Sequence, residues 1–124
     1  MKFSSLNCMP LLQPNPSKFP INASNIYFVK ISEIIYCEAS GPYTTFTIHE
    51  RNKIITSRNL KEYETLLEPH SLARCHHGFL VNLRKIKFMD KNDGNTLVLE
   101  GENRIPLSTR KKDEILMRLN KLFL

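Results

Sequence analysis

The chain has 124 residues, a hydrophobic content of 41% and a formal net charge of +6. This length suits one domain with its own core, and no apolar run approaches the ~20 residues of a membrane-spanning helix. A basic domain of this size favours a polyanionic partner, such as nucleic acid or an anionic membrane surface.

The cysteines and the N-terminus indicate the cellular compartment. The three cysteines are odd in number and widely spaced, with no Cys-x-x-Cys pair: Cys8, Cys37 and Cys75. The N-terminus lacks the long apolar stretch of a signal peptide. The sequence therefore predicts a cytoplasmic protein with reduced thiols.

Residues 1–23 differ in composition from the rest of the chain. They hold four of the seven prolines, namely Pro10, Pro14, Pro16 and Pro20. Proline fixes φ and removes a hydrogen-bond donor, so this segment is predicted to be an extended linker or arm. The folded domain is predicted to span residues 24–124.

Short runs of β-branched and aromatic residues, separated by turn signals, follow from Ile26 onward. Together they predict a mostly β fold of about ten short, largely antiparallel strands in a layered arrangement. The clearest strands are expected at 26–29, 34–39, 44–49, 53–57, 86–89, 96–100 and 104–107.

Two segments have helical spacing instead. Residues 59–67 place apolar side chains on one face, with Asn59 as N-cap, and Pro69 should end the helix. A final helix is predicted from about Arg110, capped by Ser108 and Thr109. Its apolar face is expected to consist of Ile115, Leu116, Leu119, Leu122 and Phe123.

The stretch from Arg74 to Leu83 combines a polar half with an apolar half. Arg-Cys-His-His-Gly suggests a surface that grips a partner, and Phe-Leu-Val-Asn-Leu suggests an anchor in the core. Alternation breaks at Gly78, which predicts a turn or a short tight helix there. Polar side chains next to such a turn are typically presented in a loop.

Structural alternatives exist for several of these residues. Arg74 can pair with Glu38 or another acid across the sheet, Cys75 suits a small buried filler, and Asn82 suits a capping or hydrogen-bonding role. A metal site at Cys75, His76 and His77 is disfavoured because consecutive residues rarely ligate one ion. No motif of the kind that carries catalysis is present, so the chain is predicted not to be an enzyme.

The pattern Arg-x-His-x-x-Phe-Leu-Val-Asn-Leu, followed by Ile86, resembles the core signature of the LytTR family. These are DNA-binding domains of bacterial response regulators. The resemblance continues upstream at 34–39 and 60–62 and downstream at 105–108, and it covers roughly residues 26–119. Several spaced motifs in the right order are more specific than one short match.

The resemblance implies sequence-specific binding of double-stranded DNA by three loops that enter the major groove, in transcription regulation. It implies no cofactor and no membrane partner, but a receiver domain or a second copy on adjacent DNA repeats as further partners. The implied base contacts are Thr44, Tyr43, His77 and Arg110. The implied phosphate contacts are Arg74, His76, Lys85, Lys87, Ser108 and Lys111.

Two positions depart from the family pattern. Gly78 stands where the family usually has Ser, and His77 occupies a position that varies among members. Both bear on which bases are preferred. Three consecutive cations at the start of the last helix oppose its dipole, which favours a bound anion there. The alternative interpretation is a β-rich protein-interaction or ligand-binding module that uses the same face.

Overall fold

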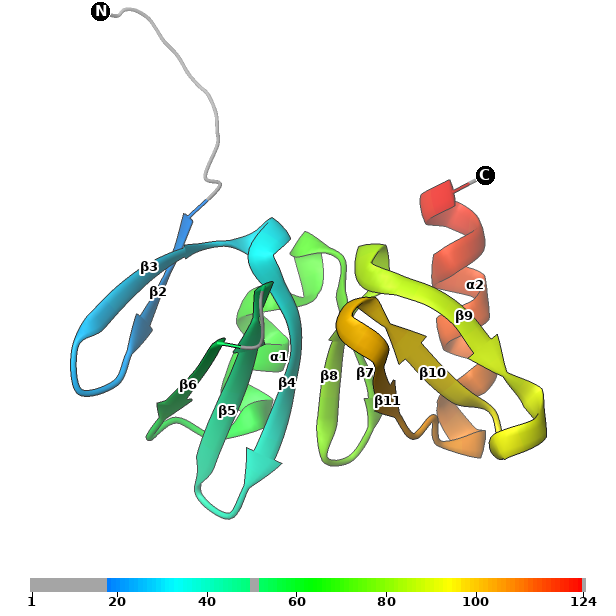
Figure 1. Ribbon diagram of the computed structural model, residues 1–124, viewed down its shortest axis with the longest axis horizontal. Helices are drawn as coiled ribbons and strands as arrows, with labels where there is room; N and C mark the ends of the chain where they lie inside the picture. The colour runs from blue at the N-terminus through cyan, green and yellow to red at the C-terminus, as the bar shows by residue number, and fades with distance from the viewer. Residues whose placement is uncertain (1–17, 50–51, 124) are drawn as a thin grey trace, which may run out of the picture.

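The computed structural model describes residues 18–49 and 52–123, and within them ten short antiparallel strands form three sheets (Figure 1). One helix lies in mid-chain and one at the C-terminus. This confirms the predicted fold class: a mostly β domain of about ten short strands with two such helices.

The largest sheet has five strands, in the order β6 (Asn52–Thr56), β5 (Tyr43–Ile48), β4 (Ile34–Ser40), β8 (Phe79–Asn82) and β7 (Leu72–His76). Three of its four pairings join neighbours along the chain. The fourth pairs β4 with β8, with Cys37 opposite Leu80, and so connects the two halves of the sequence.

This sheet has a hydrophobic core on each face. Ile34 and Cys37 contribute to one core, while Ile35 and Tyr36 contribute to the other, and a register shift lies between Ile34 and Tyr36. A strand covered on both sides is apolar throughout instead of alternating. Double coverage therefore explains the continuous apolar run at the start of β4.

The first core is closed by a hairpin of β2 (Lys18–Asn22) with β3 (Ile26–Lys30) and by helix α1 (Leu60–Leu67). The side chain of Asn59 accepts a hydrogen bond of 3.0 Å from the backbone amide of Glu62, which confirms the predicted N-cap. Tyr63 of α1 is buried edge-on against Phe46, with ring centroids 4.7 Å apart. Helix and sheet are thus fixed to each other by aromatic packing.

The second core is closed by a three-stranded sheet and the C-terminal helix: β9 (Ile86–Asp90), β10 (Thr96–Leu99), β11 (Asn103–Ile105) and α2 (Lys112–Phe123). Short 3₁₀ turns connect the elements: η1 (Ile31–Glu33), η3 (Glu68–His70), η4 (Leu83–Lys85), η5 (Lys91–Asp93), η6 (Glu100–Glu102) and η7 (Thr109–Lys111).

The apolar face of α2 is narrower than predicted. Ile115 is buried, and Leu119 and Leu122 pack against the second core, but Leu116 is 38% and Phe123 58% exposed. Leu116 follows Ile115, and Phe123 follows Leu122. One position turns a side chain about 100° around the helix, so both point away from the core. The helix also begins after a 3₁₀ turn that Ser108 caps, two residues later than predicted.

The end of the predicted linker belongs to the fold. Lys18–Asn22 forms β2, Ile21 is fully buried, and the ring of Phe19 meets that of Tyr63 at 6.1 Å. Pro20 is tolerated because β2 is an edge strand that pairs only with β3, and edge strands are where sheets accept proline. The linker prediction for residues 1–17 concerns a segment outside the described residues.

Two isoleucines of the hairpin test this assignment. Ile21→Ala should lower the free energy of unfolding by about 2–5 kcal/mol, because it empties a fully buried site. Ile26→Ala in the partner strand should cost less than ~0.5 kcal/mol, because Ile26 is 57% exposed. Urea denaturation measures both, and equal small losses would mean that the hairpin is not part of the cooperative fold.

Candidate nucleic-acid interface

Three turns lie together at one end of the molecule, along the lower edge of Figure 1. They are the β4–β5 turn at Gly41–Pro42, the β7–β8 turn at His77–Gly78, and Ser108–Lys111 before α2. Two backbone hydrogen bonds tie them together: the amide of Ala39 donates to Gly78 at 2.9 Å, and the amide of Ser108 donates to Cys75 at 2.8 Å. We call these three turns the loop end.

Arg74 fixes the β7–β8 turn. Its Nη1 lies 2.7 Å from Oε1 of Glu64 on α1, and the same guanidinium donates to the carbonyls of His76 and His77. Arg74 therefore forms the ion pair that the sequence analysis gave as its structural alternative, and the acid is Glu64 instead of Glu38. No local pattern identifies Glu64, because α1 and β7 meet only in the folded protein.

The two histidines of the turn differ in exposure. His76 is half-buried, its Nδ1 accepts a hydrogen bond of 3.2 Å from the amide of Gly78, and its ring lies 5.7 Å from that of Phe79. His77 is exposed at the tip, with its ring 4.6 Å from that of His76. The ring of His77 is therefore open to a partner, supported from behind by the ring of His76.

Gly78 leaves room for the side chain that the family usually carries. Its φ is not positive, and a Cβ built there would meet Nδ1 of His76 at 3.7 Å, an ordinary van der Waals contact. Glycine is therefore not required by the backbone at this position. Its presence removes a hydroxyl that could bond to a partner, at a position where a side chain would fit.

The third turn faces the second across a hollow of about 400 Å³. It is lined by four basic side chains, one serine and two carboxylates: Arg74, His77, Arg110, Lys111, Ser108, Glu64 and Glu114. Lys111 lies 3.6 Å from Glu114, and the hydroxyl of Ser108 accepts from the amide of Arg110 at 3.3 Å. Arg110 is exposed, and its guanidinium has no carboxylate partner within residues 18–49 and 52–123.

The acids that follow partly offset the three consecutive cations at the helix start. Asp113 and Glu114 occupy the first turn of α2, where negative charge is favoured by the helix dipole. The unfavourable interaction of the three cations with the helix dipole is therefore smaller than the sequence analysis assumed, and it is weaker evidence for a bound anion. The exposure of Arg110 does not depend on it.

The first turn presents only one of its two predicted residues. Tyr43 is 49% exposed, whereas Thr44 is fully buried and its hydroxyl donates to the carbonyl of Arg58 at 2.7 Å. Thr44 therefore does not fit a direct base contact in this structure. Its hydrogen bond instead ties the start of β5 to the segment that leads into α1.

Lys85 and Lys87 are not brought to the loop end. Lys85 lies in η4, after β8, and is therefore one strand length away from the β7–β8 turn. It lies 3.5 Å from Glu100, and Lys87 lies 3.2 Å from Glu102. The remaining predicted phosphate contacts, His76, Ser108 and Lys111, all lie at the loop end.

The structural roles expected for Cys75 and Asn82 are confirmed. Cys75 is fully buried, and burial raises the pKa of its thiol to about 12. Asn82 is buried, its amide donates to Ile34 at 2.8 Å, and its carbonyl accepts from the amide of Arg84 at 3.1 Å. Neither side chain is available to a partner at the surface.

Two features are absent from the described part of the chain. It contains no group of three or more His, Cys, Asp or Glu side chains placed to hold a metal ion. None of its helices combines the length and the apolar character that crossing a membrane requires.

Comparison with known proteins identifies the family of this domain. The family model of the LytTr DNA-binding domain matches residues 24–120. The chain is 30% identical over 97 residues to the transcriptional regulatory protein YpdB of Escherichia coli K12 and to that of Shigella flexneri. The alignment covers 76% of this chain and 39% of each relative, so the chain spans about two fifths of their length.

A solved structure shares the fold. It is the LytTr DNA-binding domain of a protein from Bacillus cereus described as a methyl-accepting/DNA response regulator, with a TM-score of 0.70 and 26% sequence identity. The match covers 85% of this chain and 98% of that one. The chain therefore belongs to the LytTR family of DNA-binding domains, a non-enzymatic family whose members act in transcription regulation.

Proposed function

We propose that this domain binds double-stranded DNA in a sequence-specific way, with the three turns of the loop end entering the major groove. His77 and Arg110 contact base edges, and Tyr43 lies at the neighbouring groove segment. An arginine fork matches O6 and N7 of guanine, and an imidazole can donate to or accept from a base edge.

The single observation that carries this proposal is the exposure of His77 and Arg110 on two turns that backbone hydrogen bonds hold together. The backbone of these turns is ordered before binding, so less conformational freedom is lost there and more of the interaction energy appears as affinity. Two such groups on neighbouring turns are placed to contact neighbouring parts of one groove.

The remaining polar groups of the loop end position the DNA backbone. Lys111 can exchange its exposed contact with Glu114 for a phosphate, because exposed ion pairs contribute little. His76 and the hydroxyl of Ser108 add hydrogen-bonding groups at the same edge. Such contacts fix register and orientation and carry no sequence information. Arg74 acts as a positioning residue that holds the turn for His77.

A salt titration tests the electrostatic part of the proposal. With about six phosphates contacted, the logarithm of the affinity for random duplex DNA should fall with the logarithm of salt concentration with a slope of about −5. Fluorescence anisotropy with a labelled duplex measures this slope. A slope near zero would contradict phosphate neutralisation and favour the alternative of a protein-interaction module.

We further propose that the domain serves as the output module of a longer cytoplasmic response regulator. The curated relatives extend well beyond the matched region, since 97 aligned residues make up 39% of their length. A receiver domain, or a second copy on an adjacent DNA repeat, would then supply regulation. Determining the full-length gene product tests the first part of this proposal.

A further inference from the structure

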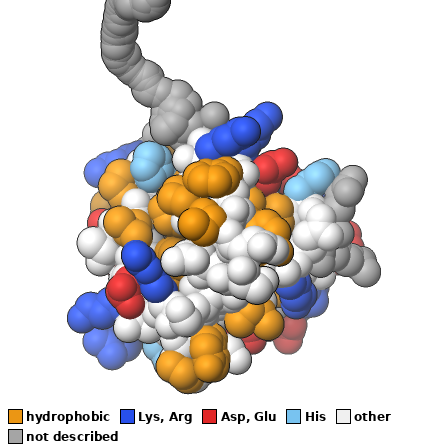
Figure 2. All heavy atoms as spheres, turned by 90° about the vertical axis from the view of Figure 1, so that its left-hand side faces the viewer, with side chains coloured by type: hydrophobic (Ala, Val, Ile, Leu, Met, Phe, Trp, Pro, Cys, Tyr) orange, Lys and Arg blue, Asp and Glu red, His pale blue; other side chains and the backbone are white. Residues whose placement is uncertain are grey.

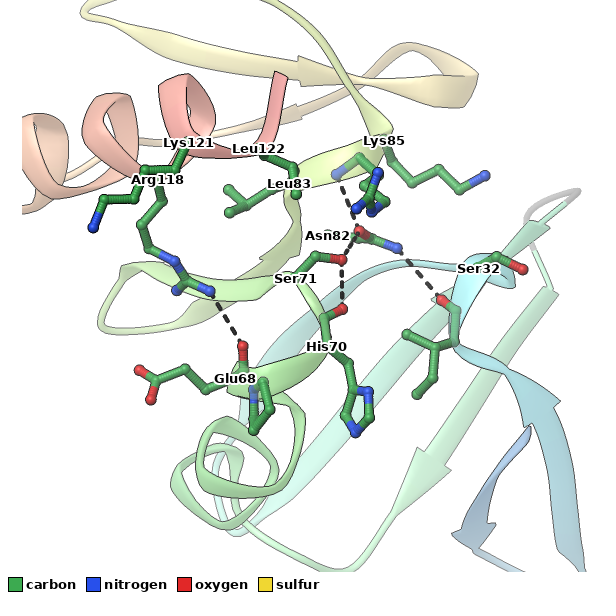
Figure 3. Close-up of a pocket in the computed structure, with 13 residues that line it drawn as sticks. Ser32, Glu68, His70, Ser71, Asn82, Leu83, Lys85, Arg118, Lys121 and Leu122 are labelled. Atoms are coloured by element: carbon green, nitrogen blue, oxygen red, sulfur yellow. Dashed lines mark hydrogen bonds between the residues drawn. The ribbon is translucent and has the colours of Figure 1, made fainter. Parts of the chain in front are cut away.

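A cavity of about 700 Å³ (Figure 3) lies at the end of the molecule opposite the loop end, near the top of Figure 1. It is formed by η1, η3, η4 and the last turns of α2. β4, β7, β8 and α2 all run between the two ends, because each begins or finishes beside one of these turns. A strand or helix of this length separates the cavity from the proposed DNA contacts by roughly 15 Å.

The cavity is rich in positive charge. Four cationic side chains line it against one carboxylate: Arg84, Lys85, Arg118, Lys121 and Glu68. Lys85 has a carboxylate partner in Glu100, and Arg118 donates only to the backbone carbonyl of Glu68, at 3.2 Å. Arg84 and Lys121 are exposed and have no hydrogen-bond or ion-pair partner for their side chains in the described part of the chain.

Apolar surface lies beside these charges. Leu83 of η4 is buried and Leu122 of α2 packs against the same core, and the two side chains lie next to each other in Figure 3. Pro69 and Ile31 line the cavity as well. The polar side chain of Asn82, which also lines the cavity, already has hydrogen-bond partners in the backbone of Ile34 and Arg84.

A volume of this size falls within the range of small-molecule sites, in which an apolar lining is combined with a few placed polar groups. We propose that this cavity binds a small molecule that joins an anionic group, either carboxylate or phosphate, to an apolar ring. The two cations of the lining that have no partner among the described residues, Arg84 and Lys121, attract the anion, and Leu122 and Pro69 contact the ring. This site is independent of the DNA-binding proposal.

Three probes of equal ring size test the site: 2-naphthoate, 2-naphthyl phosphate and the neutral 2-naphthylmethanol. Each is titrated at fixed ionic strength into ¹⁵N-labelled protein. At least one anion should shift the amides of Ile31, Ser71, Leu83 and Leu122 saturably, with a Kd on the order of 1 mM or tighter for about a dozen heavy atoms. The tighter anion identifies the group that the site takes.

Charge-matched variants separate the site from general attraction. The Arg84→Gln, Lys121→Gln double variant should weaken anion binding roughly tenfold, because a charge-assisted hydrogen bond is lost. The Lys61→Gln, Lys91→Gln double variant removes the same net charge from exposed positions outside the cavity and should change Kd less than about twofold.

Three outcomes would overturn the proposal. One is the absence of saturable shifts at the cavity with both anions. A second is equally tight binding of 2-naphthylmethanol, because the cations would then contribute nothing. The third is a set of shifts confined to Ile26 and Phe28, the exposed apolar residues of β3, with none at the cavity. Strand β3 lies at the left of Figure 1, the side that is turned toward the viewer in Figure 2.

Discussion

Replacing Arg110 with alanine should weaken binding to a cognate duplex by about 1–3 kcal/mol and binding to random duplex much less. The reason is that, in our proposal, the exposed guanidinium, which forms no ion pair in the described structure, makes a two-pronged contact with one base. A fork of this kind discriminates between bases, whereas a phosphate contact does not. The cognate duplex is obtained by enriching random duplexes on the purified domain.

His77 provides an independent check on the same assignment. Because it lies on a different turn, His77→Ala should relax preference at a different base step from Arg110→Ala. Lys30→Ala serves as the control, since it removes one exposed charge from the end of β3, which lies away from the loop end. It should alter cognate and random affinities alike and only slightly.

Equal losses on cognate and random DNA for Arg110→Ala would show that Arg110 only contacts phosphate. The assignment of the third turn to base contact would then be wrong. Circular dichroism of each variant checks folding first, and both variants should fold because Arg110 and His77 are exposed.

Replacing Asn82 with alanine should lower the free energy of unfolding by about 2–4 kcal/mol. Its buried amide donates to Ile34 at 2.8 Å, and its carbonyl caps η4 through the amide of Arg84. Alanine would leave the carbonyl of Ile34 without this donor and the backbone amide of Arg84 without its acceptor.

Asn120→Ala is the matched control for this substitution. Asn120 is exposed on α2, and alanine is the better helix former, so its change in stability should stay within ±0.5 kcal/mol. Urea denaturation at equal ionic strength measures both variants. A loss below about 1 kcal/mol for Asn82→Ala would contradict the structural role assigned to this asparagine.

Local patterns predicted most elements because the sequence marks their boundaries. Asn59 precedes a helical apolar face, and its side chain caps α1 as expected. The Gly41–Pro42 turn separates two β-branched runs, and both are strands. The alternation of side chains that is typical of a strand ends at Gly78, and the structure has the β7–β8 turn at that position.

The errors come from contacts between residues distant in sequence. The proline at position 20 led to the prediction that residues 18–22 belong to a linker. They form β2 instead, an edge strand, where proline is tolerated. Thr44 was expected to face a partner, but its hydroxyl bonds to a carbonyl 14 residues away. The continuous apolar run of β4 did not show which residues face which core, because both faces are covered.

The candidate site was only partly predictable for the same reason. His77 and Arg110 were identified from motif position, and the structure places both on exposed turns at one end. Lys85 and Lys87 follow the central stretch in sequence but lie away from that end, since β8 carries the chain across the sheet. Sequence proximity to the motif was a poor guide to position in space.

The central claim is that the loop end, and not the cavity end, contacts DNA. Titrating ¹⁵N-labelled protein with a selected duplex while following amide shifts tests it directly. We predict the largest changes at Gly41–Thr45, at His76–Gly78 and at Ser108–Lys111, with little change at Arg84, Arg118 and Lys121. Changes gathered at these last three residues, with the loop end unaffected, would contradict the account.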